Sequence, residues 1–148
     1  MIKVYRTADA IAHNIEIPQK KTIGASGFDV QALMPYGDFT LYPRQFITVS
    51  TGLMFDIPWG YEIVIRGRSG LWFKHSVSIG QEGTIDSDYT GEVKVKLVNL
   101  GNTPFDIANG DRIAQAVVQI VPDVEMTECV GTIKKTDRGT GGFGSTGK

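Results

Sequence analysis

The chain has 148 residues, a length that suits one domain with a hydrophobic core of ordinary size. Its 15 basic and 16 acidic residues leave a formal net charge of −1 without any block of Lys or Arg, so a polymeric nucleic acid is not an expected partner. The chain has one cysteine, Cys129, no segment apolar enough to span a membrane and no signal-peptide pattern in residues 1–6, and we therefore expect a cytoplasmic protein that binds small molecules or other proteins.

The predicted elements are short strands separated by turns. Residues 45–49 and 61–66 alternate between apolar and polar side chains, which is the period-two pattern of a strand with one buried face. Residues 92–98 show this pattern most clearly, and residues 114–121 predict a more deeply buried strand. Clusters of Pro, Gly, Asn and Asp mark turns at residues 35–38, 58–60, 101–104 and 109–111.

The number and spacing of these strands predict an all-β fold. No stretch sustains helical periodicity, and at most one or two turns of helix follow Ser69. Many short strands with regular turns are typical of a β-sandwich, a jelly roll or a barrel. The composition changes only near the end of the chain, so we expect one domain over residues 1–135 and a flexible glycine-rich arm over residues 136–148.

Two segments in the first half of the chain carry polar residues that a core does not require. Asp29 stands between apolar neighbours and is either a turn or capping residue or a functional carboxylate. Residues 66–71 combine two arginines, a serine and two glycines. The planar guanidinium group of arginine can donate two parallel hydrogen bonds to phosphate oxygens, and glycine lets backbone amides approach an anion. An exposed loop with surface arginines explains the same residues equally well.

Two further segments lie in the second half. Residues 83–92 are interpreted as the tip of a hairpin with strands on both sides, and they supply two aspartates and a tyrosine. A carboxylate there could bind a metal, act as a general base or cap the turn. Residues 110–115 lead from a turn into an apolar strand, and Gln115 is a polar residue in this strand that burial alone does not require.

The tail over residues 138–148 contains five glycines around one aromatic ring, that of Phe143. Glycine at this density leaves backbone N–H groups free to turn toward an anion, and Ser145 and Thr146 add hydroxyl donors. We interpret the tail as an arm that closes over a phosphorylated ligand with an aromatic face. A merely solubilising tail is the alternative.

Together the five segments resemble, in type, order and spacing, the five motifs of the homotrimeric dUTPase family. The resemblance covers residues 24–148, and the tail sequence Arg-Gly-x-Gly-Gly-Phe-Gly-Ser-Thr-Gly is among its most diagnostic parts. Members are distorted jelly rolls of the β-clip type that assemble as homotrimers. The resemblance therefore implies three shared active sites, each built from all three chains, with the arm of one subunit closing over a neighbour's site.

The implied reaction is the hydrolysis of dUTP to dUMP and pyrophosphate, which keeps uracil out of DNA and supplies dUMP for dTMP synthesis. Asp86 matches the carboxylate that deprotonates the water attacking the α-phosphate. The implied cofactor is Mg²⁺, held mainly by the substrate phosphates, with one of its waters reaching Asp29. The phosphate-binding residues implied by the motifs are Arg68, Ser69, Gly70 and Gln115 from the domain and Arg138, Ser145 and Thr146 from the arm.

The resemblance also implies how uracil and deoxyribose are chosen. Tyr89 would lie beneath the deoxyribose and exclude a 2′-hydroxyl, while Phe143 would stack on uracil when the arm closes. The backbone that pairs with uracil would come from Gly80, Gly83, Thr84 and Ile85, and from the returning strand near Lys94. Two positions depart from the family pattern: Gly67 stands where proline is common, and Gly80 stands where many bacterial members have asparagine.

Rival functions fit the residues less well. The related dCTP deaminases carry Asp-Pro-Gly-Trp at this hairpin and a glutamate ten residues after its aspartate, whereas this chain has Ser87 and Lys96 at the corresponding positions. A nucleotide-gated binding protein without turnover would not need an intact Asp86 and a complete tail. The source could be a bacterium or a bacteriophage, in which case the cytoplasm is that of the host.

Overall fold

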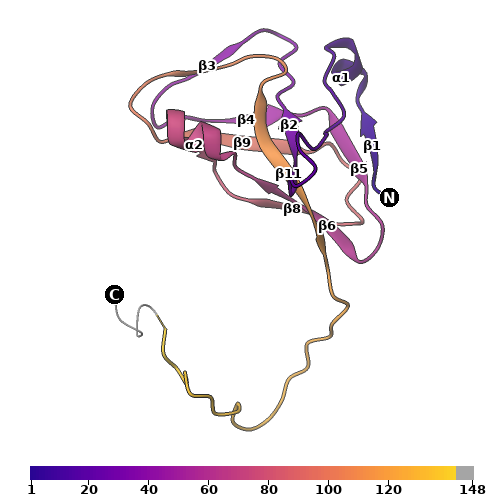
Figure 1. The fold of residues 1–148 in the computed structure, drawn as a ribbon, viewed down its shortest axis with the longest axis vertical. Helices are drawn as coiled ribbons and strands as arrows, with labels where there is room; N and C mark the ends of the chain where they lie inside the picture. Colours follow the sequence, from indigo (N-terminus) through magenta and orange to yellow (C-terminus); the bar gives the residue numbers. More distant parts are fainter. Residues whose placement is uncertain (143–148) are drawn as a thin grey trace.

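The structure is a computed structural model that describes residues 1–142, and nearly all of its regular structure is strand (Figure 1). The all-β jelly-roll class expected from the sequence is confirmed. The elements in chain order are β1 (Lys3–Arg6), α1 (Ala8–Ala12), β2 (Gly27–Gln31), β3 (Phe39–Leu41), β4 (Phe46–Ser50), β5 (Leu53–Asp56), β6 (Tyr61–Arg66), α2 (Ser69–His75), β7 (Val77–Ile79), β8 (Gly83–Ile85), β9 (Lys94–Asn99), β10 (Phe105–Ile107) and β11 (Arg112–Ile120).

Four antiparallel sheets build the body. The largest has the strand order β2-β11-β6-β8, and a second has the order β4-β9-β7. Strands β1 and β5 form one two-stranded sheet, and β3 and β10 form another. Fully buried apolar side chains from several of these sheets pack into one core, among them Leu41, Leu53, Ile63, Leu97, Ile107 and Ile113.

Strand β11 is the longest strand and the centre of the largest sheet, because it pairs with β2 on one side and with β6 on the other. Its Ala114 and Ala116 are buried, as the apolar pattern of the sequence predicts. The strand begins two residues earlier than expected. Strand β9 begins at Lys94, later than expected, and buries Val95 and Leu97 while exposing Lys94 and Lys96.

Residues 83–92, expected as the tip of a hairpin, lie between β7 and β9, and these two strands pair antiparallel as a hairpin requires. The Gly80 N–H continues this ladder by donating to the Lys96 carbonyl at 2.8 Å. Strand β8 lies inside the segment and does not pair with β9, since β8 pairs with β6 while β9 pairs with β4 and β7. The connection between β7 and β9 therefore carries β8 into the other sheet.

Two short helices accompany the strands. Helix α2 occupies the turn or two of helix expected after Ser69, whereas α1 was not expected. Helix α1 is capped by Thr7, whose hydroxyl accepts the Ala10 N–H at 3.2 Å. Over residues 1–142, neither helix has the length and apolar character needed to cross a bilayer.

The chain leaves the body after β11. Residues 121–140 are exposed and carry neither helix nor strand, and the ribbon runs away from the sheets (Figure 1). Within this segment the Arg138 Nε donates to the Gly141 carbonyl at 2.8 Å, forming a local turn. The expected boundary at residue 135 falls inside this extended stretch and stays a prediction.

Candidate functional site

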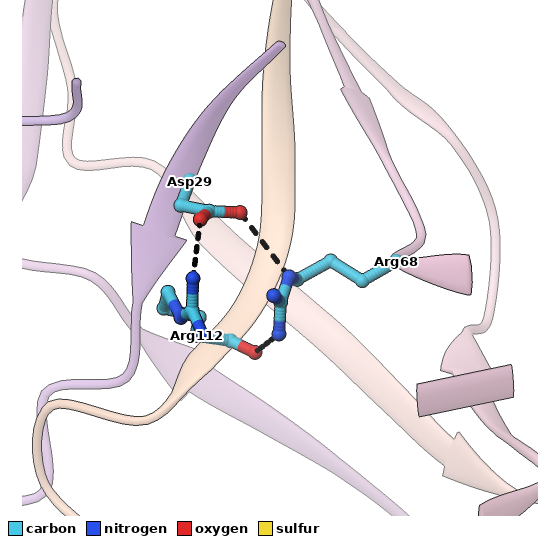
Figure 2. A network of polar contacts seen from close by, with 3 residues as sticks. All are labelled: Asp29, Arg68 and Arg112. Atoms are coloured by element: carbon cyan, nitrogen blue, oxygen red, sulfur yellow. Dashed lines mark hydrogen bonds and ion pairs between the residues drawn. The ribbon is translucent and has the colours of Figure 1, made fainter. Parts of the chain in front are cut away.

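A cluster of one carboxylate and two guanidinium groups lies where β2, β11 and the start of α2 meet (Figure 2). Arg68 Nε donates to Asp29 Oδ1 at 3.2 Å, and an Arg112 terminal nitrogen, Nη1, donates to Asp29 Oδ2 at 3.0 Å. Arg68 Nη1 also donates to the Arg112 carbonyl at 2.8 Å. The three side chains thus hold one another in fixed positions.

The register of β11 against β2 explains why these groups meet. In a regular strand, Arg112 and Gln115 would point to opposite faces, because they are an odd number of residues apart. A shift in register between Arg112 and Ala114 places Arg112 opposite Gln31 and Gln115 opposite Asp29. Opposite residues of an antiparallel pair share a face, so this irregularity brings Arg112 and Gln115 to the face that carries Asp29.

The same register aligns Gln115 with its neighbours on both sides. Gln115 lies opposite Asp29 on β2 and opposite Arg66 on β6. Gly27 packs against it, since a Cβ at position 27 would lie only 3.1 Å from both Cβ and Oε1 of Gln115. A larger residue at Gly27 would therefore press on the Gln115 amide.

The cluster is suited to an anion. Its two guanidinium groups and one carboxylate leave a net positive charge, and the Asp29 side chain is only 11% exposed. The contacts of Arg68 with Asp29 and Arg112 use two of the five N–H donors of its guanidinium group. Arg68 can therefore be oriented by the protein and still donate to a ligand.

Removal of the Asp29 carboxylate should destabilise the fold. We expect Asp29→Ala to lower the free energy of unfolding by about 1–3 kcal/mol, because it leaves partly buried guanidinium donors without their acceptor. Asp56→Ala is the matched control, since the Lys3–Asp56 ion pair has side chains that are 65% and 52% exposed, and it should have a much smaller effect. Urea unfolding at one protein concentration measures both, and equal losses would contradict the argument.

A second group of expected residues surrounds a cavity of about 420 Å³ between β8 and β9. A turn forms one wall, in which the Tyr89 N–H donates to the Asp86 carbonyl at 3.1 Å. This turn puts the Asp86 carboxylate and the Tyr89 ring at its two ends. Five of the residues expected from the sequence line this cavity: Thr84, Ile85, Asp86, Tyr89 and Lys94.

The remaining expected residues are placed apart from this cavity. Gly80 and Gly83 line a larger open groove of about 1050 Å³, which Thr84 also borders. Ser69 and Gly70 are exposed at the start of α2, where the first N–H groups of a helix have no partner within it. Arg138 lies in the exposed segment after β11, and Phe143, Ser145 and Thr146 lie outside the described residues.

The two groups of residues do not share a cavity within one chain. Asp29, Arg68 and Gln115 are absent from the lining of the cavity that holds Asp86 and Tyr89, in the part of the chain that the structure describes. The chain therefore presents a positively charged arginine–carboxylate cluster and a separate cavity bordered by the exposed Asp86 carboxylate.

The side chains near this site limit how a divalent cation can be bound. Among residues 1–142, no group of three or more His, Cys, Asp or Glu side chains could hold a metal ion. Both oxygens of Asp29 accept arginine N–H groups, but a carboxylate has about four lone-pair positions and can also accept a water. These residues fit an ion that is carried by phosphate oxygens and keeps its waters, as Mg²⁺ does.

Arg112 was missed by the sequence analysis. Residues 110–115 were singled out for Gln115, and the arginine three residues before it was left without a role. The signal was a guanidinium group at the start of a buried strand, next to a turn. Its position became interpretable only with the register shift, which the sequence pattern does not reveal.

Comparisons with known proteins identify the family to which this chain belongs. A model of the dUTPase family matches residues 13–147. The deoxyuridine 5′-triphosphate nucleotidohydrolase of Finegoldia magna is 47% identical over 135 residues, which are 90% of this chain and 93% of that protein. The enzyme of the same name from Treponema pallidum subsp. pallidum is 46% identical over 131 residues, covering 88% and 89% of the two chains.

Solved structures share the fold at lower sequence identity. A mutant dUTPase of Staphylococcus bacteriophage 80alpha with dUpNHpp has a TM-score of 0.88 at 21% identity, covering 100% of this chain and 99% of that one. A mutant dUTPase from phage phi11 of S. aureus, described as revealing the coordination of a structural Mg(II) ion, has a TM-score of 0.78 at 19% identity. It covers 88% of this chain and 97% of that one.

Proposed function

This chain belongs to the dUTPase family, and from that premise we propose how its residues carry out the family's reaction. The protein is a dUTP diphosphatase, which hydrolyses dUTP to dUMP and pyrophosphate. The observation that carries the assignment of roles is the cavity in which Asp86 and Tyr89 meet Thr84, Ile85 and Lys94.

Asp86 is the general base. Its carboxylate is exposed at the start of the turn and borders the cavity, so it can accept a proton from a water that attacks the α-phosphate. The bond between the α-phosphorus and the bridging oxygen then breaks, and pyrophosphate leaves with the negative charge. Donors that stabilise this charge belong on the side of the leaving group.

The arginine cluster supplies donors for that charge. Arg68 is oriented by Asp29 and by the Arg112 carbonyl, and it lies next to Ser69 and Gly70 at the start of α2. Gln115 shares the sheet face with Asp29. Arg68, Ser69, Gly70 and Gln115 bind the phosphates from the domain, and Arg138, Ser145 and Thr146 bind them from the arm.

Mg²⁺ would be held mainly by the substrate phosphates, and Asp29 is the carboxylate that would accept a hydrogen bond from one of its waters. When bound, the ion neutralises phosphate charge and fixes the shape of the triphosphate. Asp29 therefore has two tasks, since it also holds Arg68 and Arg112 in place.

The cavity selects base and sugar. Thr84 and Ile85 of β8 and Lys94 at the start of β9 border it, so we assign uracil pairing to amides and carbonyls of these two strands. Tyr89 lies under the deoxyribose, where a 2′-hydroxyl would meet its ring. Gly80 and Gly83 leave the uracil-binding backbone without bulky side chains, and Phe143 stacks on the base when the arm closes.

The test of this function is pyrophosphate release from dUTP, dCTP, dTTP and UTP in parallel, with the products identified by chromatography. We expect release from dUTP alone, with dUMP as the second product, and loss of the activity when excess EDTA removes Mg²⁺. Tight binding of dUTP without any release would contradict the proposal and favour a nucleotide-gated binding protein.

The active site is shared between subunits of a homotrimer, and the enzyme works in the cytoplasm of a bacterium, or of the host if a phage encodes it. Two observations support the assembly. The cavity with Asp86 and the cluster with Arg68 are separate within one chain. Apolar side chains after β11 are also left exposed in the single chain, among them Val124, Met126, Val130 and Ile133.

Mixing two inactive variants tests the shared site. We expect Arg68→Ala and Asp86→Asn to be nearly inactive alone, and their co-expression to restore activity in about one quarter of the sites. This fraction follows because a site that takes Arg68 from one subunit and Asp86 from another is intact when each comes from the suitable variant. Co-expression without any recovery, in mixed oligomers shown by mass spectrometry to contain both variants, would contradict it.

A further inference from the structure

The ring of Tyr89 lies against the backbone of Gly91, two residues further along the chain. A Cβ atom built on Gly91 would lie 2.5 Å from the Tyr89 Oη, 2.7 Å from its Cζ and 3.2 Å from its Cε2. Real Cβ atoms do not approach other heavy atoms within 3.0 Å. A side chain at position 91 and the present position of the Tyr89 ring therefore exclude each other.

The φ angle of Gly91 does not require glycine. Six glycines of the described chain have a positive φ, and Gly91 is not one of them. Residues with a side chain adopt its conformation without the strain of the left-handed region. The reason for glycine at this position is the space that it leaves for the Tyr89 ring.

The segment that follows Gly91 is anchored to the body, so the ring would move before the backbone does. The Glu92 Oε1 accepts the Gly52 N–H at 2.8 Å, and the Val93 N–H donates to the Leu53 carbonyl at 2.8 Å. Tyr89 has one hydrogen bond from its side chain in this region, from its Oη to the Glu92 carbonyl at 3.1 Å, and it is 45% exposed.

We infer that Gly91 is a positioning residue that sets the place of the Tyr89 ring and, through it, the discrimination between dUTP and UTP. The inference rests on the proposed function, which puts Tyr89 beneath the deoxyribose. Tyr89 contacts the sugar, and Gly91 acts through Tyr89. A methyl group at position 91 rotates the ring away from the wall of the cavity and opens space for a 2′-hydroxyl.

The test is a double-mutant cycle on the wild-type protein, Gly91→Ala, Tyr89→Ala and the combined variant, with kcat/KM measured for dUTP and for UTP. We expect Gly91→Ala to reduce the ratio of the two values by about tenfold, which is the usual scale of discrimination in a pocket that gains or loses one small group. In the Tyr89→Ala background, Gly91→Ala should have no further effect on the ratio, because the group that it displaces is gone.

Gly24→Ala is the matched control. Position 24 also lacks a positive φ, and a Cβ there would meet nothing within 4 Å, so the ratio should stay at the wild-type value. A folded Gly91→Ala protein with unchanged discrimination would overturn the inference, as would an equal effect of Gly91→Ala in both backgrounds.

Two further outcomes can be distinguished from a failure of the inference itself: a wrong role for Tyr89, and a Gly91→Ala protein that does not fold. Unchanged discrimination in Tyr89→Ala would show that the role given to Tyr89 under the proposed function is wrong, and the inference would fall with it. If Gly91→Ala does not fold, the combined variant decides. A folded combined variant supports the steric conflict with Tyr89, whereas an unfolded one overturns it, because the backbone itself would then require glycine.

Discussion

Replacement of Asp86 by asparagine is expected to lower kcat for dUTP hydrolysis by a factor of about 10² to 10⁴, while dUTP binding changes little. The substitution keeps the size of the side chain and removes the group that accepts the proton of the attacking water. The turn is preserved, because its hydrogen bond joins the Tyr89 N–H to the backbone carbonyl of Asp86. Steady-state kinetics and titration calorimetry with dUTP measure the two effects separately.

Asp88→Asn is the control for this experiment. Asp88 lies on the same turn and is exposed like Asp86, so the substitution makes the same change in charge two residues away. It should leave kcat within a small factor of the wild-type value. If the two variants lost activity equally, the field of the acidic turn would be responsible, and Asp86 would not be the specific base.

Deletion of residues 139–148 should lower kcat/KM for dUTP by about 100-fold or more, since the loss of even one donor to a developing charge costs that much in other enzymes. The deletion removes Phe143, Ser145 and Thr146, which in our proposal close over the nucleotide. The domain should keep its fold, because residues 121–140 are exposed and carry neither helix nor strand. Circular dichroism and thermal unfolding check this point.

A second variant separates the length of the tail from its chemistry. Replacement of Phe143, Ser145 and Thr146 by glycine keeps the number of residues and removes the ring and the hydroxyl groups. We expect it to lose nearly as much activity as the deletion. A truncated protein with full activity would exclude a catalytic role for the arm, and full activity of the glycine variant alone would assign the effect to the backbone.

The sequence was informative wherever a local pattern decides the structure. The alternation over residues 92–98 predicted β9, since one face of that strand is buried and the other is exposed. The apolar run at 114–121 predicted β11 as a more deeply buried strand, and the one or two turns of helix allowed after Ser69 correspond to α2. Among the residues that line the cavity at Asp86, the carboxylate and the tyrosine were singled out from their types, whereas Thr84, Ile85 and Lys94 followed from the family resemblance.

The features that the sequence did not predict depend mostly on contacts between segments that are distant in the chain. The segment around residues 83–92 has strands on both sides, and nothing in its own residues reveals that β8 pairs with β6 while β9 pairs with β4 and β7. The same is true of Arg112, whose side chain reaches Asp29 only through a shift in register. Helix α1 has five residues, too few for a period of 3.6 to show in the sequence.

The short turn from Asp86 to Tyr89 joins two tasks that many enzymes assign to separate parts. The residue that we propose to meet the sugar, Tyr89, and the residue that we propose to activate water, Asp86, are the two ends of one hydrogen-bonded turn. In this arrangement, a nucleotide that shifts the backbone at Tyr89 would also move the Asp86 carboxylate relative to the α-phosphate. A wrong sugar is then penalised in the rate of the chemical step as well as in binding, and substrate range and catalytic speed cannot evolve independently at this turn.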